Sequence, residues 1–188
     1  MKPISNKWLF AISVVFGVAL VLAASSYDHW TRRPEVTTSK LTTDISVAEQ
    51  IQLEDIPQLK ARGFAAIIDL RPDGEAAGQP AAQAVESAAH ENHMGFTYVP
   101  VPHGDIPDAA VTALSRAILT SPHPILLYCR SGRRAVRTWS LAEASRPDGL
   151  DTDAIHAAVR ASGQSAEDLN AAITQRIALR TGKNGDTP

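Results

Sequence analysis

Cysteine is nearly absent from this chain, since Cys129 is the only one among 188 residues. A single thiol excludes a disulfide within the chain and offers no set of thiolates for a structural zinc site. The six histidines are scattered, with neither a His-Glu-x-x-His nor a His-x-His spacing. We therefore expect no metal and no cofactor.

The chain also lacks a large excess of positive or of negative charge. The net charge of −2 gives no overall case for nucleic-acid binding, so we expect no nucleic-acid partner. The length of 188 residues allows one globular domain with a substantial core. Arginines do cluster locally, between residues 130 and 137, and this favours a small anionic substrate.

The N-terminal region contains a long run without charge. Lys7 and Asp28 bracket the twenty uncharged residues 8–27, enough helix to span about 30 Å of bilayer core. The run predicts a transmembrane anchor that follows a short flank at 1–7. A cleaved signal peptide ending near 23–26 is the alternative. We expect the N-terminus inside and the following domain outside the cytoplasm, which a C-terminal topology-reporter fusion would test.

The rest of the chain alternates between short apolar runs and helical patterns. Residues 28–43 read as a linker, 44–180 as the folded domain and 181–188 as a disordered tail. Strands are predicted at 45–47 (a short edge strand), 64–70, 96–101 and 124–128. Helices are predicted at 54–62, 80–92, 107–118, 136–142, 152–161 and 166–178. This alternation predicts a three-layer α/β/α domain with a mainly parallel sheet, whose ligand site lies at the carboxyl ends of the strands.

Cys129 follows the predicted strand 124–128 and precedes a turn of small residues and arginines. The turn reads Cys129-Arg-Ser-Gly-Arg-Arg134, and Arg137 follows on the next helix. The partial positive charge of a helix N-terminus favours a thiolate over a thiol. Successive amide groups in such a turn converge on one point, so we expect an anion-binding site at Arg130, Ser131, Gly132, Arg133 and Arg134. A buried, purely structural cysteine is the alternative. On the functional interpretation, the sulfur faces solvent.

Two motifs together resemble a known family. Arg71-Pro-Asp-Gly-Glu75, continued by Gly78-Gln-Pro80, combines with Cys129-Arg-Ser-Gly-x-Arg134. Over residues 41–145 the chain resembles the phosphatase-like domain of the beta-lactamase-hydrolase-like proteins, which is also labelled a sulfurtransferase. The resemblance implies the fold of cysteine-dependent dual-specificity and tyrosine phosphatases, with a relation to rhodaneses.

The phosphatase interpretation assigns three catalytic residues. Cys129 attacks phosphorus to form a cysteinyl-phosphate, and Arg134 holds the phosphoryl oxygens. Asp105 lies on the loop after the predicted strand 96–101 and protonates the leaving group, unless it merely begins the next helix. His103 and Asp108 are substitutes for Asp105. Asp69 and Arg71 border the pocket, whereas Asp73 and Glu75 are interpreted as turn residues.

The length of the loop supports a second interpretation. A tyrosine-phosphatase loop, Cys-x5-Arg, would require arginine at position 135, where this chain has Ala135. The six residues from Cys129 to Arg134 instead match the rhodanese loop, which favours sulfur transfer through a Cys129 persulfide and needs no acid. A membrane-tethered module that binds anions without catalysis is the third hypothesis.

Overall fold

The computed structural model describes residue 17 and residues 35–183, and a compact unit begins at Val36. The predicted anchor at 8–27, its flank at 1–7 and the tail residues 184–188 lie outside the described residues. Within the part that is described, no helix has both the length and the apolar character needed to cross a membrane.

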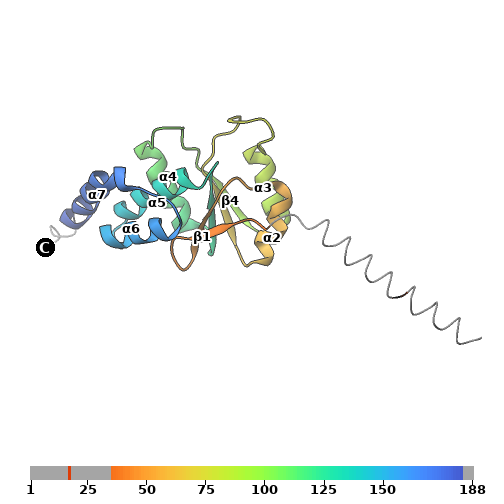
Figure 1. Cartoon of the computed structure of the whole chain (residues 1–188), viewed down its shortest axis with the longest axis horizontal. Helices are drawn as coiled ribbons and strands as arrows, with labels where there is room; N and C mark the ends of the chain where they lie inside the picture. The colour runs from red at the N-terminus through yellow and green to blue at the C-terminus, as the bar shows by residue number, and fades with distance from the viewer. Residues whose placement is uncertain (1–16, 18–34, 184–188) are drawn as a thin grey trace, which may run out of the picture. The chain divides into compact units, whose positions relative to one another are not determined.

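A five-stranded sheet forms the centre of the domain (Figure 1). Its strands are β1 (Thr38–Lys40), β2 (Ile45–Ala48), β3 (Ala66–Asp69), β4 (Gly95–Tyr98) and β5 (Ile125–Tyr128). They lie in the order β1-β2-β5-β3-β4, and β2, β5, β3 and β4 are parallel. These four strands therefore end at one edge of the sheet, where the segments that follow them can form a site.

Strand β1 differs from the sequence expectation. It pairs antiparallel with β2, with Ser39 opposite Val47, so the sheet is mixed and the prediction of a mainly parallel sheet is corrected. It also lies in the segment 28–43 that was interpreted as a linker, and it makes β2 an inner strand rather than an edge strand. Three residues of Thr, Ser and Lys carry no apolar alternation, so only the short turn and the pairing with β2 define this strand.

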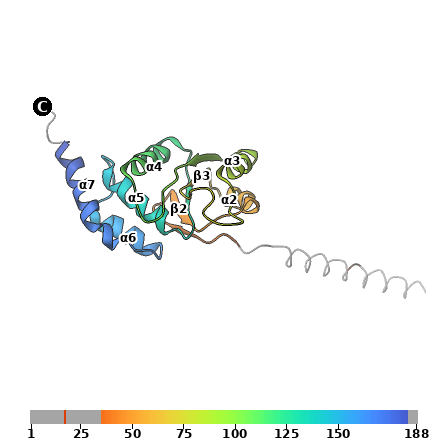
Figure 2. The ribbon, with the colours of Figure 1, turned by 90° about the horizontal axis from the view of Figure 1, so that it is seen from above.

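Helices cover both faces of the sheet, so the domain has the three layers that the sequence predicts (Figure 2). The helices are η1 (Leu53–Asp55), α2 (Ile56–Ala61), α3 (Ala82–Glu91), α4 (Asp108–Thr120), α5 (Arg133–Ser145), α6 (Thr152–Ala161), η2 (Glu167–Leu169) and α7 (Asn170–Lys183). α2 and α3 lie on one face, α4 and α5 lie on the other, and α6 and α7 pack against α5. Because α7 ends at Lys183, residues 181–183 of the predicted disordered tail are helical.

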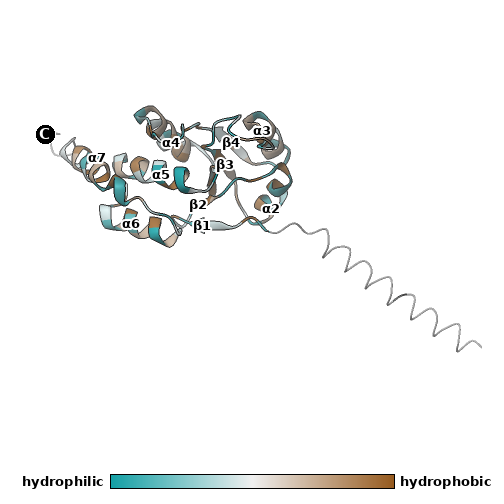
Figure 3. Cartoon of the chain, turned by 45° about the horizontal axis from the view of Figure 1, so that its top comes forward, coloured by the Kyte–Doolittle hydropathy of each residue, from teal (hydrophilic) through white to brown (hydrophobic). Residues whose placement is uncertain are grey.

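Helix α6 shows how the C-terminal segment joins this structure. Ile155 and Val159 are buried in the core on the α5 side of the sheet, and Figure 3 shows hydrophilic and hydrophobic bands alternating along the helix. At the N-terminus of α6, the Asp151 side chain accepts a hydrogen bond from the Ala154 amide at 2.8 Å. Such a cap stabilises a helix by about 1 kcal/mol.

Strand β5 is buried on both faces, and this determines where Cys129 lies. Ile125 and Leu127 belong to the core under α5, while Leu126 and Tyr128 belong to the core under α2 and α3. Burying an aliphatic side chain of this size stabilises the fold by about 1.5–3 kcal/mol. A shift of β5 by one residue relative to its neighbouring strands would move each of these side chains to the opposite face of the sheet, and this would cost part of that free energy. Because side chains alternate between the two faces along a strand, Cys129 lies on the same side as Ile125 and Leu127, under α5.

Candidate active site

The turn between β5 and α5 forms the floor of the candidate site. Gly132 is the N-cap residue of α5 and has a φ of 76°, a left-handed conformation that costs a residue with a Cβ about 1–2 kcal/mol. No side chain caps this helix N-terminus. Within the described part of the chain, the amide groups of residues 130–135 donate no hydrogen bond, whereas the Val136 amide bonds to the Gly132 carbonyl at 3.0 Å. The turn therefore offers a run of free donors beside Cys129.

Neighbouring segments hold the turn through its carbonyl groups. The Gln50 amide donates to the Arg130 carbonyl at 3.4 Å, and Gln164 Nε2 donates to the Ser131 carbonyl at 3.2 Å. Gln50 follows β2, whereas Gln164 follows α6. Because these carbonyls point into the surrounding protein, the amide groups are left for a ligand.

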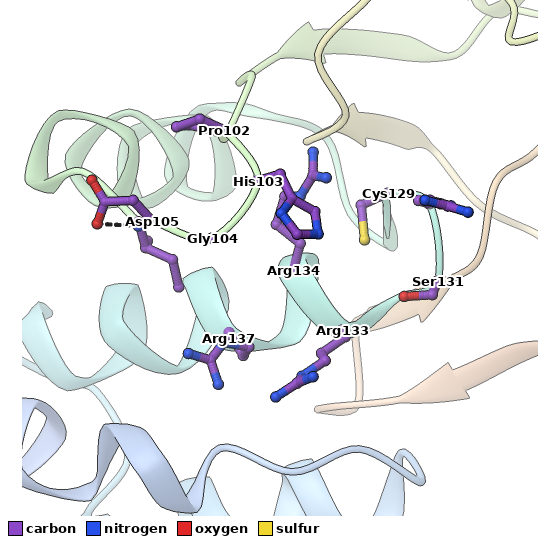
Figure 4. A pocket seen from close by; sticks show the side chains of 11 residues that line it. Pro102, His103, Gly104, Asp105, Cys129, Ser131, Arg133, Arg134 and Arg137 are labelled. Carbon is purple, nitrogen blue, oxygen red and sulfur yellow. Dashed lines mark hydrogen bonds between the residues drawn. The ribbon is translucent and has the colours of Figure 1, made fainter. Parts of the chain in front are cut away.

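Cys129 lies in a pocket of about 560 Å³. The pocket is lined by Pro102, His103, Gly104, Asp105, Ile106, Cys129, Arg130, Ser131, Arg133, Arg134 and Arg137. Cys129 itself is only 1% exposed, so the expectation of a solvent-facing sulfur is corrected. The residue continues a buried strand, and its sulfur reaches the pocket where the chain turns into α5 (Figure 4).

Arg134 is held in the wall of this pocket by two acceptors. Its Nη1 donates to the Val101 carbonyl at 2.8 Å, and its Nη2 lies 2.9 Å from Glu75 Oε1. Glu75 also accepts from Arg71 Nε at 3.1 Å. Burial acts to raise the pKa of Glu75, but the hydrogen bonds from the two arginines outweigh it and lower that pKa. Glu75 therefore stays anionic and positions Arg134.

The Glu75 bridge was missed by sequence reasoning, which treated Glu75 as a turn residue. Arg71 is nearly buried, and its Nη1 donates to Gln50 Oε1 at 2.7 Å. Three parallel strands thus contribute to one network, through Gln50 after β2, Arg71 after β3 and Val101 after β4. The only feature of the local sequence that points to this network is the pair Arg71 and Glu75, which are four residues apart in a segment that forms no helix.

The other arginines of the pocket differ in their partners. Arg130 and Arg133 are exposed and form no ion pair among the residues that the structure describes. Arg137 pairs with Asp168 of η2. Asp168 was not considered from the sequence, because nothing local links it to the cysteine turn.

Two of the three candidate acids, Asp105 and His103, lie on the loop between β4 and α4, whereas Asp108 is the first residue of α4. Asp105 lines the pocket, but its Oδ1 accepts a hydrogen bond from the Ile106 amide at 2.8 Å. In Figure 4 its carboxylate lies on the α4 side, away from the sulfur, whereas the His103 ring lies nearer to Cys129 and Arg134. The substitute Asp108 is not among the pocket residues, and it pairs with Arg176 of α7.

A buried carboxyl group lies on the strand next to β5, and it is not among the residues that line the pocket, which it was expected to border. Asp69, at the end of β3, is 1% exposed and faces Tyr128 in the strand register. Its Oδ1 accepts from the Arg71 amide at 2.8 Å, while Oδ2 has no hydrogen-bond partner. Burial raises the pKa of Asp69 to about 6, against the opposing effect of the Arg71 amide. In the described part of the chain, no group of three or more metal-binding side chains could hold an ion.

The fold and the pocket define a phosphatase-like α/β domain. The family model for the phosphatase-like domain of the beta-lactamase hydrolase-like protein matches residues 38–146, and the chain belongs to this family. Beta-lactamase hydrolase-like proteins of Xylella fastidiosa and Agrobacterium fabrum are 34% and 33% identical over 140 and 105 residues, which are 73% and 56% of this chain. The chain spans only 31% and 24% of the length of these two relatives.

Solved structures agree with the fold. A candidate phosphatase from Neisseria meningitidis is 26% identical, with a TM-score of 0.64 over 77% of this chain and 99% of that one. The core catalytic domain of the PP-IP phosphatase SIW14 of S. cerevisiae is 17% identical, with a TM-score of 0.57 over 84% and 98% of the two chains. At that identity the second similarity concerns the fold alone.

Proposed function

We propose that this chain is a cysteine-dependent phosphatase that hydrolyses a phosphomonoester. The observation that carries the proposal is the position of Cys129 at the floor of a pocket, beside the free amide groups of residues 130–135. Family membership and the phosphatase-like fold support it. Arginines make the pocket favourable for an anionic substrate.

In the proposed reaction, the Cys129 sulfur attacks phosphorus and the bond from phosphorus to the ester oxygen breaks. The amide groups of the turn and the Arg134 guanidinium stabilise the phosphoryl oxygens. Arg134 must offer a donor to the substrate while Glu75 and the Val101 carbonyl hold its other nitrogens. A water molecule then attacks the cysteinyl-phosphate, which releases phosphate and restores the thiolate.

The leaving oxygen requires a proton, and Asp105 is the proposed donor. Its carboxyl group, carrying the proton, would have to leave the Ile106 amide and turn toward the leaving oxygen, a change that catalytic loops undergo when substrate binds. His103, on the same loop, is the substitute donor.

Sulfur transfer is the second candidate function. Two observations favour it, namely the six-residue loop from Cys129 to Arg134 and the outward orientation of Asp105. A persulfide on Cys129 would use the same amide groups, and Arg130 and Arg133 would attract an anionic sulfur donor. No acid is needed in that reaction.

The decisive experiment compares the two reactions in the full chain. Phosphate release from an aryl phosphate is measured beside thiocyanate formation from thiosulfate and cyanide. Cys129→Ser should abolish whichever activity is present. Asp105→Asn should slow phosphate release by about 10²-fold or more and leave sulfur transfer unchanged. Asp153→Asn, an exposed residue in the first turn of α6, is the matched control.

The outcomes are distinct. Thiocyanate formation without phosphate release would overturn the phosphatase proposal in favour of sulfur transfer. Phosphate release that Asp105→Asn leaves unaltered would remove Asp105 from the mechanism, and the same measurement on His103→Gln would then test the substitute donor. A chain active in neither reaction would favour the non-catalytic anion-binding module.

A further inference from the structure

Arginine side chains extend the cationic lining of the pocket beyond the cysteine turn. Arg133 and Arg137 both line the pocket, and Figure 4 shows them along α5 on the side away from Pro102. They are four residues apart in a helix, so they share a face and are separated by about 6 Å along the helix axis. The reacting phosphate, held by the turn, would leave both side chains available for another group.

A carboxylate of the protein, Asp168, already pairs with Arg137, although Asp168 is not itself among the residues that line the pocket. Arg137 donates a hydrogen bond to Asp168 Oδ1. That hydrogen bond lowers the pKa of Asp168, burial opposes the change, and the charge of Arg133 contributes to it. Anionic oxygen is therefore stable in the combined field of Arg133 and Arg137.

Asp168 can leave without disturbing the core. Its side chain is 59% exposed, and its helix η2 contains no buried residue. By contrast, the Arg137 side chain is only 18% exposed and packs in the wall of the pocket. Arg133 has no ion-pair partner among the described residues, so a ligand could engage its charge directly.

We propose that Arg133 and Arg137 form a second anion subsite, which binds a phosphate or carboxylate group of the substrate after that group displaces Asp168. The preferred substrate is then a phosphomonoester that carries another anionic group about 5 Å from the reacting phosphate, a distance equal to the rise of one helical turn. This inference rests on the proposed function, since it assumes that the first phosphate binds at the cysteine turn.

The test compares two probes of the same shape. The full chain carrying Cys129→Ser, which binds without turnover, is titrated calorimetrically with 4-carboxyphenyl phosphate and with 4-carbamoylphenyl phosphate. The probes differ in one negative charge. We expect the carboxylate probe to bind about tenfold more tightly, because hydrogen bonds to charged groups have this strength.

Substitutions should change this affinity ratio in opposite directions. Arg137→Gln should bring the ratio close to one, whereas Asp168→Asn should increase it by removing the competing carboxylate. Arg160→Gln is the matched control. Arg160 is 63% exposed and pairs with Glu167, which lies in η2 beside Asp168, but Arg160 does not line the pocket. We expect the control to keep the ratio.

Three results would overturn the subsite. They are a ratio near one in the Cys129→Ser chain, a ratio that Arg137→Gln does not change, and a ratio that Asp168→Asn fails to increase. Failure of the proposed function would appear elsewhere, as an absence of phosphate release by the unsubstituted chain. That failure would leave the affinity ratio measurable.

Discussion

The buried carboxyl group of Asp69 makes the stability of this protein depend on pH in an unusual direction. Burial raises the pKa of Asp69 from 3.8 to about 6. A carboxyl with a raised folded pKa contributes stability that is fully present below its unfolded pKa and is lost as pH rises through the folded value. The window is therefore from about pH 4 to about pH 6.

The magnitude follows from the difference between the two pKa values. A rise from 3.8 to about 6 corresponds to about 3 kcal/mol of free energy of unfolding, lost when Asp69 ionises in the folded protein. Asp69→Asn removes the ionisation and keeps an oxygen that can accept from the Arg71 amide. The stability of the variant relative to the natural chain should thus increase by about 2–3 kcal/mol between pH 4 and pH 7.

The assay is urea denaturation, followed by circular dichroism, of both chains at a series of pH values. Comparing the two chains cancels the contribution of the titrating groups that do not interact with Asp69. Asp148→Asn, at an exposed carboxylate in the loop between α5 and α6 that forms no ion pair among the described residues, serves as the control for a carboxylate-to-amide change at the surface. A difference in stability between Asp69→Asn and the natural chain that stays constant from pH 4 to pH 7 would refute the reasoning.

Two further substitutions test the turn and its support. Glu75→Gln should cost about 1–2 kcal/mol at neutral pH, because it removes the charge that binds Arg71 and Arg134. The pKa of Glu75 in the folded protein is lowered, so the stability that its charge contributes is lost as the pH falls through that pKa. The difference in stability between Glu75→Gln and the natural chain should therefore vanish at acidic pH, which denaturation at acidic pH would detect. Gly132→Ala should cost about 1–2 kcal/mol because of the φ of 76°. Its new Cβ would lie 3.5 Å from the Ala48 carbonyl oxygen and Gln164 Nε2, so thermal unfolding should report strain rather than a steric clash.

Local patterns in the sequence were sufficient for most of the architecture. The apolar run 124–128 and the small residues after Cys129 predicted β5 and the turn, because strand burial and left-handed glycine are properties of a few adjacent residues. The helix at 152–161 was predicted with its observed bounds, since its apolar positions repeat with the helical period. The three layers follow from that alternation of elements.

Contacts between distant residues were decided only by the tertiary structure. Glu75 and Arg134 are 59 residues apart and meet because β3 and β5 are adjacent and end at the same edge. Asp168 reaches Arg137 because α7 packs against α5, and β1 becomes a strand only through its pairing with β2. The sequence by itself thus determined where the thiol and the arginines occur along the chain. Packing determined how deeply the sulfur is buried and which carboxylates accompany the arginines, because burial and ion pairing depend on residues that are neighbours in space alone.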